Sequence, residues 1–135
     1  MSIAKTAIDG IWNSISAACQ ASLDTPARQS RFTVREVKQD GITILTSGET
    51  TLYIARQAFE GALRYLLSHG HDAQSMCPIG SNVNYDDAGP LCRAARTAPN
   101  GQMNITYVLP VLEKMGLVGI EPRSGKIASA TWFIA

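Results

Sequence analysis

The chain has 135 residues, of which 45% are hydrophobic and 17% are charged, a composition typical of one folded domain rather than a disordered chain. Its 12 basic and 11 acidic residues exclude a strongly basic chromatin-like protein and an acidic tail. No apolar run approaches the roughly 20 residues of a membrane-spanning helix, and the N-terminus lacks the apolar stretch of a secretory signal. We therefore expect a cytoplasmic α+β protein with no membrane partner.

Residues 3–22 carry apolar side chains at intervals of three and four, and this spacing predicts a helix with one apolar face. The apolar face from Ile3 to Cys19 has to cover either the strands that follow or a second copy of the chain. Helices of this kind at a terminus often join two subunits, so we expect a homodimer. Residues 24–30, which include Pro26, are expected to form a short connector.

Three short segments rich in β-forming residues follow the connector. Asp40-Gly41 separates the first two, and this dipeptide is a strong hairpin signal because a type I′ turn needs positive φ at both central residues. A second turn at residues 46–49 separates the last two. The pattern predicts a three-stranded antiparallel meander, with strands at residues 32–37, 42–45 and 50–54.

The period then changes to that of a helix over residues 55–69, and Gly70 is expected to end this helix. Residues 71–90 have no sustained period and predict a long ordered loop, which in compact domains is often functional. A short helix is expected at 90–97, and a second at about 107–115. Pro110 interrupts this last helix, which must either begin near Leu109 or bend there.

The C-terminal sequence YVLPVLEKMGLVGIEPRSGKIASATWFI resembles the last helix and wing of a winged-helix domain. In that family a helix ends in a glycine followed by two apolar residues, and a two-stranded wing with a basic tip comes next. The order of the elements extends the resemblance over residues 55–135. The expected fold is a single α+β domain, in which residues 1–54 form the N-terminal helix and the meander. Residues 55–135 form a winged-helix-like half that ends in a β-hairpin.

The resemblance implies that this half contacts double-stranded DNA and that the protein is a small non-enzymatic regulator. In a winged-helix protein, phosphates and bases are contacted by the short helix, the front of the last helix and the wing tip. Residues 91–126 carry a net charge of +3, whereas the rest of the chain carries −2. The positions that match the DNA-contacting ones are Arg93, Arg96, Asn104, Thr106, Tyr107, Lys114, Arg123 and Lys126.

A protein partner is the alternative to DNA, because winged-helix domains also serve as docking units and a charge of +3 binds DNA weakly. The partner of such a module would be a nucleic-acid-processing protein. A small chain of this kind could be a mobile-element-encoded inhibitor that docks on a nucleic-acid machine of its host.

A second alternative is a small zinc-binding protein or a Cys/His enzyme. His69, His71, Cys77 and Cys92 are residue types that bind zinc, but their spacing fits no common zinc motif. The same cysteines and histidines, with Asp72, Asp86 or Asp87, could form a nucleophilic set, although buried inert thiols are commoner. No glycine-rich phosphate-binding motif is present. We expect no metal, no cofactor and no enzymatic activity.

The periodic segments also predict the hydrophobic core. The side chains expected to be largely buried are Phe32, Val34, Ile42, Ile44, Leu52, Ile54, Phe59, Leu63, Leu66, Leu109, Leu112, Leu117 and Trp132.

Overall fold

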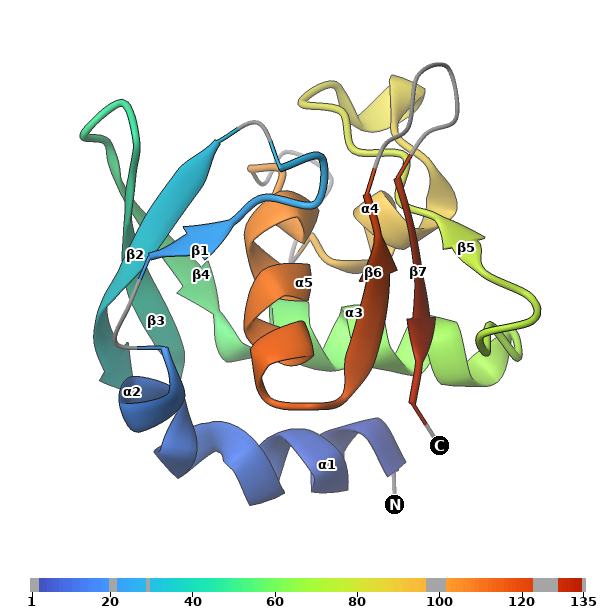
Figure 1. The fold of residues 1–135 in the computed structure, drawn as a ribbon, viewed down its shortest axis with the longest axis horizontal. Helices are drawn as coiled ribbons and strands as arrows, with labels where there is room; N and C mark the ends of the chain where they lie inside the picture. The colour runs from blue at the N-terminus through green and yellow to red at the C-terminus, as the bar shows by residue number, and fades with distance from the viewer. Residues whose placement is uncertain (1–2, 20–21, 29, 97–101, 123–128, 135) are drawn as a thin grey trace.

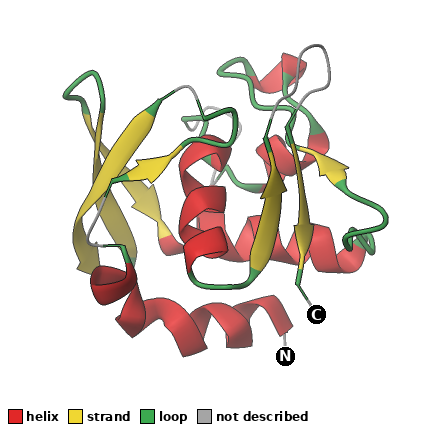
Figure 2. Cartoon of the chain, viewed as in Figure 1, coloured by secondary structure: helices red, strands yellow, loops and turns green. Residues whose placement is uncertain are grey.

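Two antiparallel sheets, with helices packed between and against them, make up the computed structural model, which confirms the expected α+β class (Figures 1 and 2). It describes residues 3–19, 22–28, 30–96, 102–122 and 129–134. Within these residues, no helix is both long and apolar enough to cross a bilayer.

The N-terminal helix is divided into three parts instead of running unbroken to residue 22. These parts are α1 (Ile3–Ile11), a 3₁₀ turn η1 (Trp12–Ser14) and α2 (Ile15–Ala18). The apolar face nevertheless stays continuous, because Ile8, Trp12 and Ile15 are all buried. Trp12 packs edge-on against Phe59, with the ring centroids 5.4 Å apart. The apolar face therefore covers the chain's own core.

The predicted meander is present as β2 (Arg31–Lys38), β3 (Gly41–Thr46) and β4 (Thr51–Ala55). The structure adds a strand within the expected connector, β1 (Leu23–Asp24), which pairs with the start of β2. This gives a four-stranded sheet in the order β1-β2-β3-β4. A β-bulge between Val34 and Glu36 interrupts the register of β2 on β3.

Helix α3 (Arg56–Ser68) follows the sheet and runs behind the last helix and the two strands of the C-terminal hairpin in Figure 1. After it come β5 (Cys77–Pro78), the 3₁₀ turn η2 (Tyr85–Asp87) and α4 (Pro90–Ala94). Helix α4 ends before the predicted residue 97, and residues 97–101 lie outside the described part of the chain. Helices α3 and α4 approach closely at Gly61, where an added Cβ would collide with the carbonyl oxygen of Ala94.

Helix α5 spans Ile105–Lys114 and contains Pro110, so it neither begins at Leu109 nor stops at the proline. It leads into the predicted hairpin, formed by β6 (Val118–Glu121) and β7 (Ala130–Phe133). Strand β5 pairs with the other side of β7, which makes a second sheet in the order β5-β7-β6. The tip of the hairpin, residues 123–128, lies outside the described residues.

The buried hydrophobic residues form one cluster to which both sheets, α1, α3, α4 and α5 contribute. Nine of the predicted core residues are buried: Phe32, Ile42, Ile44, Ile54, Phe59, Leu63, Leu66, Leu109 and Leu112. The other four, Val34, Leu52, Leu117 and Trp132, are only half-buried. Trp132 lies on the opposite face of β7 from the buried Thr131, and its ring rests on Gly119, leaving no room there for a Cβ.

Candidate functional site

Helix α5, expected to read a DNA groove, is covered by other parts of the chain. It contacts α3, β6 and β1, and in Figure 1 it lies between the two sheets. Ile105, Val108, Leu109, Val111 and Leu112 have no solvent exposure. Its one exposed residue is Lys114, while Thr106, Tyr107 and Glu113 are half-buried. The part of α5 that is most accessible to another macromolecule is therefore its C-terminal turn.

The residues at the front of α5 are engaged within the chain. Asn104 is only 4% exposed, and its Nδ2 donates to the carbonyl oxygen of Ala95 at 3.3 Å. The hydroxyl of Thr106 contacts the sulfur of Met103 at 3.5 Å. Tyr107 packs edge-on against Phe32 of β2, with the ring centroids 5.3 Å apart. All three were predicted to contact DNA, and here they pack against neighbouring parts of the fold.

Arg93 and Arg96, predicted to hold phosphates, bind backbone carbonyls of the loop before α4. Arg96 is 9% exposed, and its Nη1 donates to the carbonyl oxygen of Val83 at 3.0 Å, while its Nη2 donates to that of Asn82. Arg93, at the surface, donates to the carbonyl oxygens of Tyr85 at 3.0 Å and Asp86 at 2.8 Å. These guanidinium groups are thus directed at the protein's own loop.

The ring of Tyr85 lies beside both arginines. The guanidinium carbon of Arg93 is 5.2 Å from the ring centroid, and that of Arg96 is 5.6 Å away. Both distances fall within the range of a cation–π interaction. Tyr85 therefore links the two arginines to the middle of the loop.

Lys114 remains exposed at the end of α5, beside a surface cavity of about 370 Å³ that Arg28 also lines. Arg28 pairs with Glu113 at 3.5 Å, which holds the turn after β1 against α5. Arg123 and Lys126 lie outside the described residues. Among the described residues of the eight predicted to contact DNA, Arg93 and Lys114 are exposed and have no ion pair, but Arg93 donates to loop carbonyls whereas Lys114 does not.

The four residues weighed as candidate zinc ligands, His69, His71, Cys77 and Cys92, do not gather into one site. No group of three or more His, Cys, Asp or Glu side chains converges anywhere in the described segments. The ring of His69 stacks on that of Tyr65, with the ring centroids 4.1 Å apart. Nδ1 of His71 lies 2.8 Å from the carbonyl oxygen of Ser75. Burial raises the pKa of the Cys77 thiol to about 11, which keeps it in the unreactive protonated form near neutral pH.

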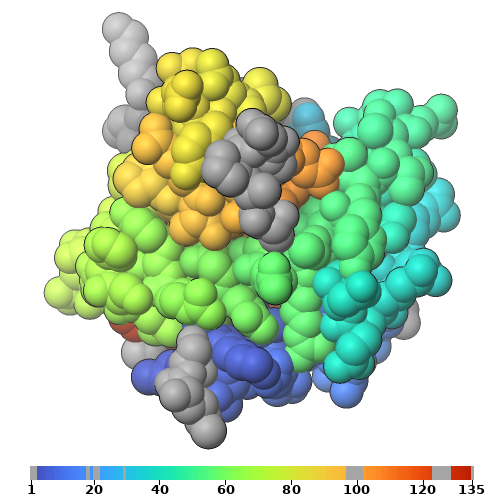
Figure 3. Space-filling view, turned by 180° about the vertical axis from the view of Figure 1, so that it is seen from behind, coloured from blue at the N-terminus to red at the C-terminus, as the bar shows by residue number. Residues whose placement is uncertain are grey.

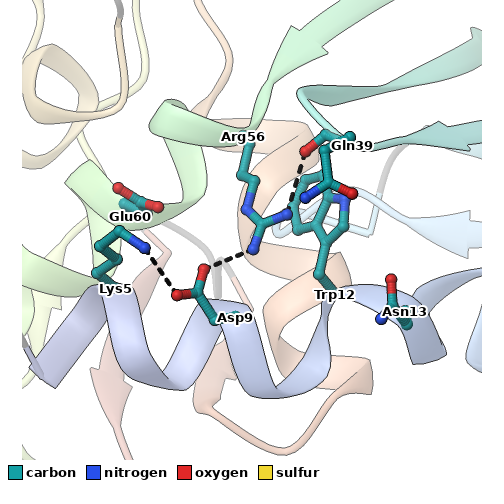
Figure 4. A pocket seen from close by; sticks show the side chains of 7 residues that line it. All are labelled: Lys5, Asp9, Trp12, Asn13, Gln39, Arg56 and Glu60. Atoms are coloured by element: carbon teal, nitrogen blue, oxygen red, sulfur yellow. Dashed lines mark hydrogen bonds and ion pairs between the residues drawn. The ribbon is translucent and has the colours of Figure 1, made fainter.

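A polar pocket of about 520 Å³ lies between α1, the β2–β3 turn and the start of α3 (Figure 4). Arg56 occupies its centre, 4.7 Å from the ring centroid of Trp12. Its guanidinium donates to Asp9 at 2.5 Å and to the carbonyl oxygen of Gln39 at 3.1 Å. Lys5 also donates to Asp9, at 2.7 Å. The sequence gives no sign of this cluster, because nothing local to Asp9 or Arg56 indicates that the two side chains meet.

The hydrogen bonds of the pocket connect three elements that are distant in sequence. Trp12 Nε1 donates to the carbonyl oxygen of Lys38 at 2.7 Å, so the indole joins η1 to the end of β2. Side-chain hydrogen bonds from Lys5 and then from Arg56 hold the pKa of Asp9 below its usual value. Because its charged groups are satisfied by one another, we interpret the cluster as a connection between elements.

No family model, curated protein or solved structure matches the chain.

Proposed function

We propose that the chain is a non-enzymatic protein-interaction module whose residues 55–135 form a winged-helix-like unit. The order α3, β5, α4, α5, β6, β7 supports the winged-helix part of this proposal, since the last helix leads directly into an antiparallel hairpin. The preference for a protein partner rests on one observation, the coverage of α5 by β1, β6 and α3.

A helix that reads bases in the major groove has to present several side chains beyond the rest of the protein. Asn104 is buried, and Tyr107 packs on Phe32, so the front of α5 offers no such row of side chains. Arg93 and Arg96 are occupied by loop carbonyls. Contact with DNA through α5 would need the first sheet to move away, whereas a protein partner can bind the surface as it stands.

Fluorescence anisotropy with a random 25-base-pair duplex tests this preference, measured with the full chain at low and at physiological salt. We expect a dissociation constant no tighter than about 10⁻⁵ M at physiological salt, the range of weak non-specific binding. The tagged chain should co-purify with a protein in a fixed molar ratio that nuclease treatment does not change. Saturable binding to DNA at nanomolar concentrations would overturn the preference for a protein partner.

Duplex DNA remains the second candidate ligand, and the exposure of Lys114 at the end of α5 favours it. The predicted wing residues Arg123 and Lys126 would add to its charge. Each phosphate contact that is lost should reduce the slope of log K against log salt by about 0.9. If DNA is the ligand, Lys114→Ala should lower the slope by about one such step, and the Arg123→Ala, Lys126→Ala double variant by about two.

A further inference from the structure

The segment from Gly80 to Gly89 is a closed loop whose two ends touch. The backbone N–H of Gly89 donates to the carbonyl oxygen of Gly80 at 2.8 Å. Gly80 has a φ of +59°, and a Cβ there would lie 2.9 Å from the Cα of Gly89. Only glycine fits such a close approach at positive φ without strain. The loop thus leaves the fold and returns at one point, at the end of the molecule that carries η2 and α4 (Figures 1 and 3).

The interior of this loop is held by side chains from both sides. Arg93 and Arg96 donate to carbonyl oxygens of residues 82, 83, 85 and 86. Within the loop, Asn82 accepts from the N–H of Asn84 at 2.8 Å, and Asn84 accepts from the N–H of Asp86 at 3.1 Å. A partner that binds this loop does not have to order it first, and this removes one of the main costs of association.

The residue that the loop displays is Val83, whose side chain is 79% exposed. It is the most exposed large hydrophobic residue in the described part of the chain. The carbonyl of Val83 is bound by the buried Arg96, so its backbone is fixed while its side chain points away from the core. Burial of an aliphatic side chain of this size in a partner's pocket removes apolar surface from water and so stabilises the interface.

The charge near Val83 indicates what kind of surface could cover it. Asp86 and Asp87 are exposed, and no ion pair to either carboxylate is found among the described residues. Arg93 is exposed beside them and Arg96 is buried, so the two carboxylates leave the exposed charge around the loop net negative. Carboxylates in this excess repel the phosphates of a nucleic acid, which argues against DNA binding at the loop. They favour a protein surface with lysine or arginine beside the apolar contact, because complementary charge accelerates encounter and selects the partner.

We propose that residues 80–89 are the docking loop of this chain, with Val83 entering a small apolar pocket of a folded partner protein that is bordered by lysine or arginine. The inference rests on the proposed function, since it names the surface and the partner chemistry of the interaction module. The rigid hold of two arginines on the loop and the exposure of Val83 carry it together.

Site-specific photo-crosslinking in the source cells tests the proposal, with p-benzoylphenylalanine placed at position 83 of the full chain. Ile3 and Tyr53, which are also exposed, provide matched positions on other faces. We expect one main adduct from position 83, and its partner is identified by mass spectrometry and purified. Adducts from position 3 or 53 alone would contradict the docking role of residues 80–89, but they would still support the proposed function as an interaction module. No adduct from any position would overturn both.

The purified partner is then titrated with variants of the full chain. Val83→Asp should weaken binding at least about tenfold, as expected for an apolar contact at the centre of an interface. Ile3→Asp is the matched control, since Ile3 is 75% exposed, and it should leave the affinity within twofold. Asp86→Asn with Asp87→Asn should lower the association rate severalfold and remove most of its salt dependence.

Two further results, one from the titrations and one from the crosslinking, would overturn the proposal. One is equal loss of affinity in Val83→Asp and Ile3→Asp, because an effect shared by two distant faces is not that of a docking loop. The other is an adduct that proves to be a second copy of this chain, with self-association lost in Val83→Asp. Circular dichroism of each variant establishes that it is folded, as expected for substitutions at such exposed positions.

Discussion

At the scale of single residues, Arg96 has an unusual environment for a charged side chain. It is 9% exposed, its Nε has no hydrogen-bond partner, and its remaining donors bind two loop carbonyls and the sulfur of Cys92. Burial of a charge is costly unless hydrogen bonds compensate it. The two carbonyl contacts are therefore what makes this position acceptable, and the loop depends on the arginine as much as the arginine depends on the loop.

Substitution of each arginine in turn measures how much the buried hydrogen bonds of Arg96 and the exposed hydrogen bonds of Arg93 contribute to stability. Arg96→Ala should lower the free energy of unfolding by about 2–3 kcal/mol, because it removes charge-assisted hydrogen bonds in a buried site. Arg93→Ala should cost less than about 1 kcal/mol, because its hydrogen bonds are open to water. Urea denaturation followed by circular dichroism measures both. Equal costs would contradict the view that Arg96 is the main support of the loop.

Gly61 and Gly10 form a matched pair of helical glycines with opposite expected effects. Gly61→Ala pushes a Cβ against the carbonyl oxygen of Ala94, so it should destabilise the fold by about 1–3 kcal/mol through forced separation of α3 and α4. Gly10→Ala meets nothing within 4 Å and should stabilise the fold by about 0.5–1 kcal/mol. Thermal melting of both variants tests this, and a stabilising Gly61→Ala would show that the helices can separate freely.

The Cys77 thiol should be inert in the folded protein. With a pKa of about 11, roughly one thiol in a thousand is ionised at pH 8. The folded pKa exceeds the unfolded value of about 8.5, so this group stabilises the fold fully below pH 8.5 and loses its contribution as pH rises through 11. Reaction with Ellman's reagent at pH 8 should be slow until urea is added. Rapid labelling of Cys77 in the native chain would contradict its burial.

At the scale of elements, the cluster of Asp9, Arg56 and Trp12 connects α1 to the first sheet and to α3. The contribution of the Asp9 carboxylate to stability can be tested by changing the pH. The pKa of Asp9 is lowered in the folded state, so its contribution is present above the unfolded pKa of about 3.9 and is lost as pH falls through the folded pKa.

The variant Asp9→Asn should therefore be less stable than the wild type at pH 6–7. The difference should shrink as the pH falls below 4, where the wild-type carboxylate becomes protonated as well. Urea unfolding between pH 2.5 and 7 measures this, with Asp87→Asn as the control because Asp87 forms no ion pair with any of the described residues. A difference that does not change with pH would rule out the ion pair as its origin.

The elements that could be predicted from the sequence are those with a sustained hydrophobic period. Helix α3 has a continuous apolar stripe, and the strands from β2 to β4 are separated by clear turn signals. Strand β1 is two residues long and lies beside Pro26, so no period could reveal it. The N-terminal helix is confirmed, but its division at Trp12 could not be predicted, because the apolar spacing persists through the 3₁₀ turn.

The surroundings of the predicted site residues could not be read from the sequence, because they depend on contacts between distant segments. Tyr107 meets Phe32, and Glu113 meets Arg28, only because β1 and β2 pack on α5. The charge of Arg93 and Arg96 is visible in the sequence, but the loop that both bind returns to them through the contact of Gly80 with Gly89. Local patterns do not encode such a return.

At the scale of the whole molecule, the N-terminal helical segment belongs to the same hydrophobic cluster as the C-terminal half. Ala4, Ile8, Trp12 and Ile15 are buried against a core that α3 shares with α5 and the second sheet. This part of the apolar face is therefore covered within one chain, whereas Ile3 is exposed. The homodimer that the sequence led us to expect stays a prediction.

A chain that begins at Thr25 provides the test of this arrangement. Removal of Ile8, Trp12 and Ile15 exposes core that these side chains stabilise by about 1.5–3 kcal/mol each. Their sum approaches the whole stability of an ordinary domain, about 5–15 kcal/mol. The truncated chain should therefore lose its cooperative unfolding transition, while Ile3→Ala, at a position that is 75% exposed, should melt like the wild type. Sedimentation of both chains tests the alternative that α1 joins two copies. In that case the full chain would be a dimer and the truncated chain a folded monomer, because the fold of one chain would not need the apolar face of α1.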